Sequence, residues 1–168
     1  KNVGVECHGL YWHSEVIDGF DKKKHLQKLL LAQSKNIQLY QFFYDEWRDK
    51  RGIVESMIAH RVNNTKRRVY ARKLSVTELG PSQQREFFDR THLSGYTPAK
   101  YALGLMGDDS VVAALSVRAP RQKKYNGYFE IARFSTELNT AVVGGLDKLI
   151  KHLKDDKLMT YVDRRVGS

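Results

Sequence analysis

Cysteine and long apolar runs are what this sequence most lacks. The chain contains a single cysteine, Cys7, which excludes an intrachain disulfide and a zinc site built from several cysteines. No apolar stretch approaches the roughly 18 residues that a membrane-spanning helix needs, and no signal peptide is recognisable at the start. We therefore expect a soluble protein of a reducing, intracellular compartment, the cytoplasm.

Acidic residues are also few compared with basic ones. The 168 residues include 19 Asp and Glu against 29 Lys and Arg, a formal net charge of +10. A surplus of this size attracts polyanions, because Lys and Arg neutralise phosphates and release their counterions. Double-stranded DNA is therefore the first partner to consider, and a basic protein that merely stays soluble is the alternative.

The first part of the chain predicts a strand, helix, strand, helix unit. Residues 3–7 form a short apolar strand, and leucines at three- and four-residue spacing predict a helix over residues 22–34. Residues 37–44 are rich in aromatic and aliphatic side chains, which favours a second strand. The apolar spacing in residues 49–62 then indicates an amphipathic helix.

A polar stretch at residues 63–65 marks a boundary to a second unit. Turn residues and alternation there predict two helices, 81–92 and 146–154, and five strands, 69–79, 100–106, 111–117, 128–134 and 158–162. We expect a mixed α/β fold in two units, residues 1–63 and 66–168, with a largely antiparallel sheet in the second. The chain is also expected to begin inside a domain and to stop in mid-loop.

The residues best suited to chemistry lie near the end of the first strand. Glu6 and His8 are two residues apart and point to one face of that strand. A carboxylate beside a second polar group suits Mg²⁺, which prefers oxygen ligands and leaves room for phosphate and water. His13, beyond a turn at Gly9, is a candidate general acid or base near neutral pH.

Each of these residues also has a purely structural interpretation. Glu6 could be an edge residue facing water, and a lone histidine is often structural or exposed. Asp45 and Glu46, after the second strand, could add metal ligands or could cap the following helix, since acids favour a helix N-terminus. Trp12 could fill a core or contact DNA.

The run Val5-Glu6-Cys7-His8-Gly9-Leu10-Tyr11-Trp12-His13, followed later by Asp45-Glu46-Trp47, resembles the Vsr-type branch of the PD-(D/E)XK nucleases. It is most similar to the variant in phage Hef-like and intron-encoded homing endonucleases. The resemblance covers roughly residues 3–62 and implies a restriction-endonuclease-like first unit that cleaves DNA phosphodiester bonds with Mg²⁺.

The resemblance also implies roles for individual residues. Glu6 is expected near the metal, with Asp45 and Glu46 as further ligands, and His13 is expected in acid/base work. His8 stands where many relatives have a lysine that steadies the attacking water. The family's principal metal-binding aspartate lies on a preceding strand, upstream of Lys1.

Three basic clusters are candidate DNA contacts, together with Trp12. A charge run is usually a solvated face, but clusters that flank a nuclease-like segment suit phosphate binding. The cations concerned are Lys22, Lys23, Lys24, Lys66, Arg67, Arg68, Arg72, Arg118, Arg121, Lys123 and Lys124.

The segment that ends in Gly144-Gly145 resembles the C-terminal region of the same phage proteins and also acetyltransferases of the GNAT type. The latter likeness implies that these glycines, at a helix start, hold a cofactor phosphate. A tight turn or a contact to the DNA backbone are the alternatives. Asp163, Arg164 and Arg165 could lie beside this loop.

Three functions follow from the sequence. The first is a Mg²⁺-dependent DNA endonuclease, which could act as a homodimer because both strands have to be cut. The second is a DNA-binding module without catalysis. The third is an acyltransferase that uses the second unit.

Overall fold

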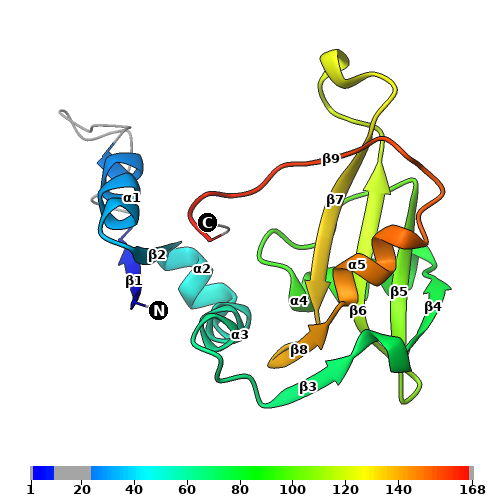
Figure 1. The fold of residues 1–168 in the computed structure, drawn as a ribbon, viewed down its shortest axis with the longest axis horizontal. Helices are drawn as coiled ribbons and strands as arrows, with labels where there is room; N and C mark the ends of the chain where they lie inside the picture. Colours follow the sequence, from blue (N-terminus) through cyan, green and yellow to red (C-terminus); the bar gives the residue numbers. More distant parts are fainter. Residues whose placement is uncertain (1, 10–23, 167–168) are drawn as a thin grey trace. The chain divides into compact units, whose positions relative to one another are not determined.

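Helices and strands follow one another along the whole described chain (Figure 1). The computed structural model describes residues 2–9 and 24–166. They belong to two compact units, Lys1–Asn63 with Val162–Ser168, and Asn64–Tyr161. The predicted mixed α/β class is confirmed. The end of the chain differs from expectation, because the residues from Val162 onward pack with the first unit and not with the second.

The first unit is built on two parallel strands. β1 (Asn2–His8) pairs with β2 (Ile37–Phe43) over its whole length. Parallel neighbours need a crossover connection, and α1 (Lys24–Ser34) lies in this connection and packs against β2. The β2 side chains Tyr40 and Phe42 are almost fully buried, which anchors the pair in the core of the unit.

Two helices follow β2, where the sequence predicted one. α2 (Tyr44–Asp49) begins directly after the strand, and α3 (Arg51–Arg61) follows it. The early start has a local cause, because the backbone N–H of Phe43 donates to the side chain of Glu46 at 2.8 Å. An acid three residues into a helix commonly closes the N-terminus in this way. Asp45 and Glu46 therefore lie on a helix and not at the end of a strand.

A five-stranded sheet forms the centre of the second unit, in the order β4-β5-β6-β7-β9. Its neighbours are antiparallel except for the last pair, β7 and β9, which is parallel. The predicted antiparallel character is confirmed. The strands are β4 (Ser75–Glu78), β5 (Tyr101–Gly107), β6 (Ser110–Arg118), β7 (Phe129–Thr136) and β9 (Leu158–Thr160).

One helix covers each face of this sheet (Figure 1). α4 (Pro81–Thr91) buries Phe87 and Phe88 against small residues of β5 and β6. α5 (Gly145–Lys151) places the fully buried Leu149 against the leucines of the opposite face. The core of the second unit therefore has two layers, divided by the sheet.

The strand predicted over residues 69–79 is broken in two. β3 (Arg67–Tyr70) pairs in parallel with β8 (Thr140–Val143), a strand that the sequence did not predict, whereas β4 pairs with β5. A single straight strand cannot join two separate sheets, and the short 3-10 helix η2 (Ala71–Lys73) supplies the change of direction. The hairpin predicted between β5 and β6 is confirmed, with positive φ at Asp108 and Asp109, as a two-residue hairpin turn favours.

Replacing a core leucine tests this arrangement. Leu105 is completely buried in the sheet, whereas Leu146 on α5 is 40% exposed. Leu105→Ala should lower the free energy of unfolding by about 2–5 kcal/mol, since it leaves a cavity. Leu146→Ala should change it by about 0.5 kcal/mol or less. Both tryptophans belong to the first unit, so their fluorescence would not report on the second unit. Urea unfolding should therefore be followed by circular dichroism. Equal losses in the two variants would contradict this core.

Candidate functional site

The carboxylate of Glu6 gathers polar side chains from both strands and the first helix of its unit. Lys28 of α1 donates from Nζ to Oε1 of Glu6 and forms an ion pair with it. Gln41 of β2 donates from Nε2 to the other oxygen at 3.4 Å. The Nε2 atom of His8 lies 3.7 Å from that same oxygen. We call Glu6, His8, Lys28 and Gln41 the Glu6 centre.

The strand register explains why these groups meet. Glu6 is directly opposite Gln41 in the parallel pair, so the two side chains leave the sheet on the same face. α1 crosses from the first strand to the second and brings Lys28 over that face. The sequence prediction that Glu6 and His8 share a face agrees with their short separation.

The Glu6 centre has an open side and a closed side. The side chain of Lys28 is 49% exposed and that of Glu6 is 26% exposed, so a ligand in solution can reach both. His8 is only 4% exposed, and its ring packs on His25 and Phe43 with centroid distances of 4.1 and 6.0 Å. His8 is therefore placed behind Glu6, where it can position the carboxylate more easily than it can meet a substrate.

The surroundings of Glu6 keep its carboxylate ionised. Burial acts to raise the pKa of this carboxyl group, but the hydrogen bonds from Lys28 and Gln41 and the nearby positive charges of His8 and Lys28 outweigh burial. The net result is a pKa below the ordinary value of 4.5. At neutral pH, the Glu6 carboxylate is therefore charged, and it can serve as an oxygen ligand for a cation or accept a proton.

Lys28 and Gln41 were not among the residues singled out in the sequence. Gln41 could have been found, because it interrupts an apolar strand and a buried amide must have hydrogen-bond partners. Lys28 could not, because a lysine on a helix surface has no distinctive local pattern.

Asp45 and Glu46, which the sequence offered either as metal ligands or as the start of a helix, lie in the first turn of α2. Asp45 accepts a hydrogen bond from the backbone N–H of Glu46 at 2.9 Å. Both carboxylate oxygens of Glu46 bind the guanidinium of Arg165 at 3.1 Å, and this guanidinium also lies 4.6 Å from the centroid of the Phe43 ring. Glu46 therefore also holds the end of the chain, and neither acid is among the side chains that contact Glu6 in the described ranges.

The described residues do not fit a complete Mg²⁺ site. Within residues 2–9 and 24–166, no group of three or more His, Cys, Asp or Glu side chains is arranged to hold a metal. Glu6 alone contributes an accessible carboxylate, and Lys28 already pairs with it. His13 and Trp12 lie outside the described residues.

The end of the chain completes the first unit. The backbone carbonyl of Arg165 accepts a hydrogen bond from the backbone N–H of Gln41 at 3.0 Å, and Arg61 donates to the carbonyl of Val166 at 3.3 Å. Asp163 binds the side chain of Arg165. Asp163 and Arg165, which the sequence suggested beside Gly144-Gly145, belong to the first unit, whereas the two glycines belong to the second.

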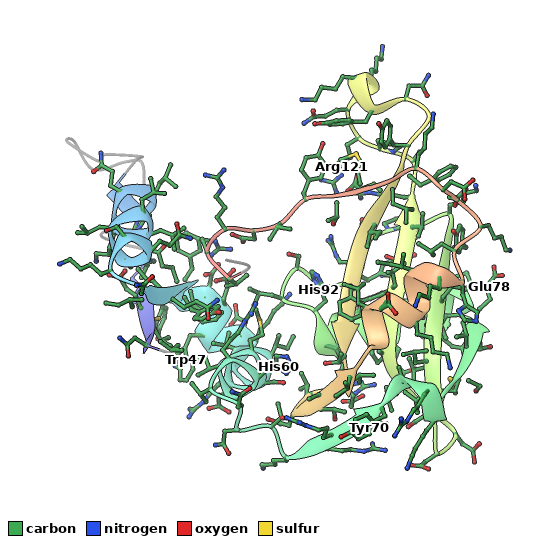
Figure 2. The ribbon with its side chains drawn as sticks, in the orientation of Figure 1. Trp47, His60, Tyr70, Glu78, His92 and Arg121 are labelled. Carbon is green, nitrogen blue, oxygen red and sulfur yellow. The ribbon has the colours of Figure 1, made fainter. Side chains whose placement is uncertain are left out.

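Two of the predicted basic clusters are surface features of the second unit. Tyr70 on β3 and Arg121 after β6 mark them, and they lie at opposite ends of that unit (Figure 2). The clusters are therefore two separate surfaces. Their exposed cations are Lys66, Arg67, Arg68, Arg72, Arg121, Lys123 and Lys124.

Some of these cations already have partners. Arg67 pairs with Asp108 at 3.0 Å, and Arg118 pairs with the buried Glu130 at 2.5 Å. The third cluster is outside the description, because Lys22 and Lys23 precede the described part of α1 and only the backbone of Lys24 is described.

The two glycines before α5 have structural roles. Gly144 has a φ of +73°, a left-handed conformation that favours glycine. Gly145 is buried, and a Cβ on it would lie 2.9 Å from a methyl group of Val142. The turn and the close packing account for both residues, and no described contact points to a cofactor phosphate there.

Comparisons with protein-family models, with curated proteins and with solved structures find no match for this chain. No helix in the described ranges is long and apolar enough to cross a membrane.

Removing the ammonium of Lys28 tests the electrostatics of the Glu6 centre. Burial raises the pKa of the Glu6 carboxyl, and the hydrogen bond from Lys28 is the largest effect that lowers it. In Lys28→Met this effect is lost, so the pKa of Glu6 should rise. In the wild type, the depressed pKa stabilises the fold above pH 4.5, and this contribution disappears as the pH falls through the folded pKa. In Lys28→Met, the free energy of unfolding should therefore fall less as the pH is lowered.

Carbon-13 NMR titration of labelled glutamate side chains measures the shift directly. Lys35→Met removes an exposed lysine just after α1 and serves as the matched control. An unchanged Glu6 pKa in Lys28→Met would show that the ion pair does not form in solution.

Proposed function

We propose that this chain is part of a Mg²⁺-dependent DNA endonuclease that hydrolyses phosphodiester bonds at the Glu6 centre. The observation that carries the proposal is the accessible pairing of Glu6 with the ammonium of Lys28, supported from behind by His8. The likeness of the segment Val5 to His13 to Vsr-type nucleases supports the same chemistry. Dependence on Mg²⁺ is part of the proposal on the strength of that likeness.

The Glu6 centre contains the two kinds of group that phosphodiester hydrolysis uses. An ionised carboxylate can orient a water molecule and accept its proton as the oxygen attacks phosphorus. A neighbouring ammonium can stabilise the negative charge that grows on the phosphate oxygens. Lys28 is half-exposed, so it can contact a phosphate while it remains close to Glu6.

The charge of the chain supports DNA as the substrate. The net charge of +10 favours a polyanion over a small neutral substrate. Exposed arginines and lysines at both ends of the second unit can contact phosphates without reading sequence. In this proposal the first unit cuts and the second unit holds the DNA.

A DNA-binding module without catalysis is the second candidate. It is favoured by the engagement of Asp45 and Glu46 in the helix start and the chain end, which leaves Glu6 as the accessible carboxylate of the described site. In this case the Glu6–Lys28 pair is only an ion pair that stabilises the fold. The cationic surfaces would bind DNA equally well.

Glu6→Gln separates the two candidates. The substitution keeps the size of the side chain and removes its charge, so an endonuclease should cut supercoiled plasmid about a hundredfold more slowly or worse, since the loss of a positioned acid or base costs about that much. DNA affinity, measured in EDTA, should remain nearly unchanged. EDTA should also stop cleavage by the wild-type chain.

Glu55→Gln is the matched control, because Glu55 is an exposed residue of α3 that pairs with Arg51 in the same unit. It should cut like the wild type. Wild-type rates for Glu6→Gln would overturn the catalytic role. A wild-type chain that binds DNA but does not cut it with Mg²⁺ would favour the module without catalysis.

Charge reversal on β3 tests the role of the second unit. Arg67→Glu combined with Arg68→Glu should weaken binding to all DNA sequences alike and flatten the dependence of affinity on salt, as phosphate contacts do. Lys151→Glu combined with Lys157→Glu makes the same change in net charge at exposed positions elsewhere in the unit. Equal effects of the two pairs would indicate that net charge matters and that β3 makes no particular contact.

A further inference from the structure

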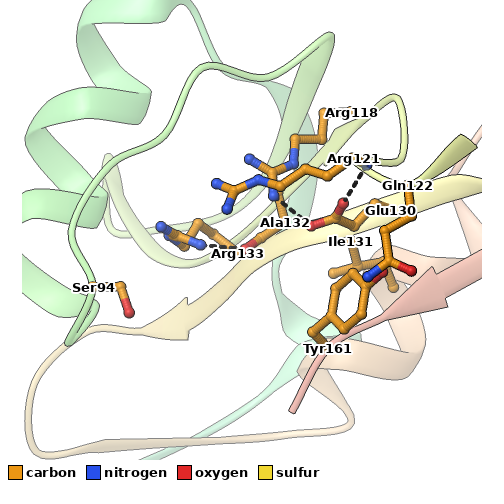
Figure 3. Close-up of a pocket in the computed structure, with 9 residues that line it drawn as sticks. All are labelled: Ser94, Arg118, Arg121, Gln122, Glu130, Ile131, Ala132, Arg133 and Tyr161. Carbon is orange, nitrogen blue, oxygen red and sulfur yellow. Dashed lines mark hydrogen bonds and ion pairs between the residues drawn. The ribbon is translucent and has the colours of Figure 1, made fainter. Parts of the chain in front are cut away.

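A pocket in the second unit gathers three arginines that the proposed cleavage chemistry does not use (Figure 3). Its volume is about 520 Å³, within the range of roughly 300–1,000 Å³ typical of ligand pockets. The lining comes from β6, from β7, from the loop between them, from Ser94 after α4 and from the residue that follows β9. We call it the arginine pocket, and its principal residues are Arg118, Arg121, Gln122, Glu130, Arg133 and Tyr161.

One acid in the arginine pocket faces three cations. Glu130 is almost completely buried, and it accepts hydrogen bonds from the side chain of Arg118 at 2.5 Å and from the backbone N–H of Arg121 at 3.4 Å. The charge of Glu130 is therefore largely matched by Arg118. The guanidinium groups of Arg121 and Arg133 are left with a positive surplus.

Arg133 is held in place by neutral groups. Its Nε donates to the carbonyl of Gly95 at 2.7 Å, and a second nitrogen donates to the carbonyl of Ala132 at 2.8 Å. No ion pair to Arg133 occurs in the described part of the chain. Burial lowers the pKa of Arg133, and so do the charges of Arg118 and Arg121. An anion placed among these guanidinium groups would relieve their mutual repulsion.

The other side of the pocket is suited to a planar group. Tyr161 is 51% exposed and lines the pocket with Gln122, and Figure 3 shows its ring away from the guanidinium groups of Arg121 and Arg133. Bases stack on exposed aromatic side chains regardless of sequence, because every base has a π-face. A phosphate group alone would fill only a small part of the pocket and would leave Tyr161 without a role.

We propose that the arginine pocket binds one unpaired nucleotide of a DNA strand. Its phosphate lies against Arg121 and Arg133, and its base stacks on Tyr161. A base within a duplex is covered by its stacked neighbours and cannot present its face to a side chain in a pocket. The inference rests on the proposed function for its DNA partner, and it adds that the second unit holds a strand that is locally open.

Two variants in the pocket test the proposal. The affinity of each variant is measured in EDTA for a fluorescently labelled single DNA strand and for the duplex that contains this strand. Arg121→Gln should weaken single-strand binding about tenfold, as expected for the loss of a hydrogen bond to a charged group. It should also lower the salt slope by about 0.7 for the lost phosphate contact. Tyr161→Ala should weaken single-strand binding by about fivefold or more and leave the salt slope unchanged.

Both variants should weaken binding of the duplex less than binding of the single strand. Arg85→Gln, an exposed arginine of α4 that does not line the pocket, should behave like the wild type. Unchanged single-strand binding in Arg121→Gln and Tyr161→Ala would overturn the proposal, and so would equal losses for duplex and single strand. Protection of the pocket by coenzyme A, with DNA binding unaffected by either variant, would also overturn it.

These measurements are independent of catalysis. Glu6→Gln should bind the single strand as the wild type does, because Glu6 belongs to the other unit. If Glu6→Gln leaves cleavage intact but the pocket variants behave as expected, the catalytic assignment fails and the nucleotide pocket stands.

Discussion

The parallel pairing of β1 with β2 is the constraint on which the Glu6 centre depends. It places Glu6 opposite Gln41, and the crossover that it requires carries Lys28. A slip of one residue would turn Glu6 to the other face and separate it from both partners. The end of the chain helps to hold this register, because the backbone N–H of Gln41 donates to the carbonyl of Arg165. Residues distant in sequence therefore determine the environment of one carboxylate.

The two units differ in how their carboxylates and cations are paired. In the first unit, Glu6 and Glu46 are both matched by cations, Lys28 and Arg165. In the second unit, the buried Glu130 matches Arg118 and leaves two further arginines of the pocket in surplus. The buried carboxylate of Glu130 thus holds Arg118 in place. The other two arginines of the pocket, Arg121 and Arg133, can then bind an anion. In the proposed function, the first unit does the chemistry and the second unit holds the DNA.

Local pattern predicted the parts of the structure that depend on neighbours in sequence. Alternation on a strand placed Glu6 and His8 together, and periodicity placed most helices. For Asp45 and Glu46 the sequence left two interpretations open, metal ligands or the start of a helix, and the structure shows them at the start of α2, a helix that no apolar spacing marked. Lys28, Arg133 and Tyr161 could not have been assigned, since their positions depend on a crossover helix and on strand pairings that no local pattern encodes.

The most direct test of this account is the structure of the chain bound to a gapped DNA duplex with Ca²⁺ in place of Mg²⁺, so that binding can be observed without cleavage. The account predicts a phosphate in contact with Lys28, with a water molecule between it and the Glu6 carboxylate, and an unpaired nucleotide in the arginine pocket with its base on Tyr161. DNA bound only along the second unit, with the Glu6–Lys28 pair facing solvent, would contradict the claim that Glu6 is the centre of a hydrolytic site.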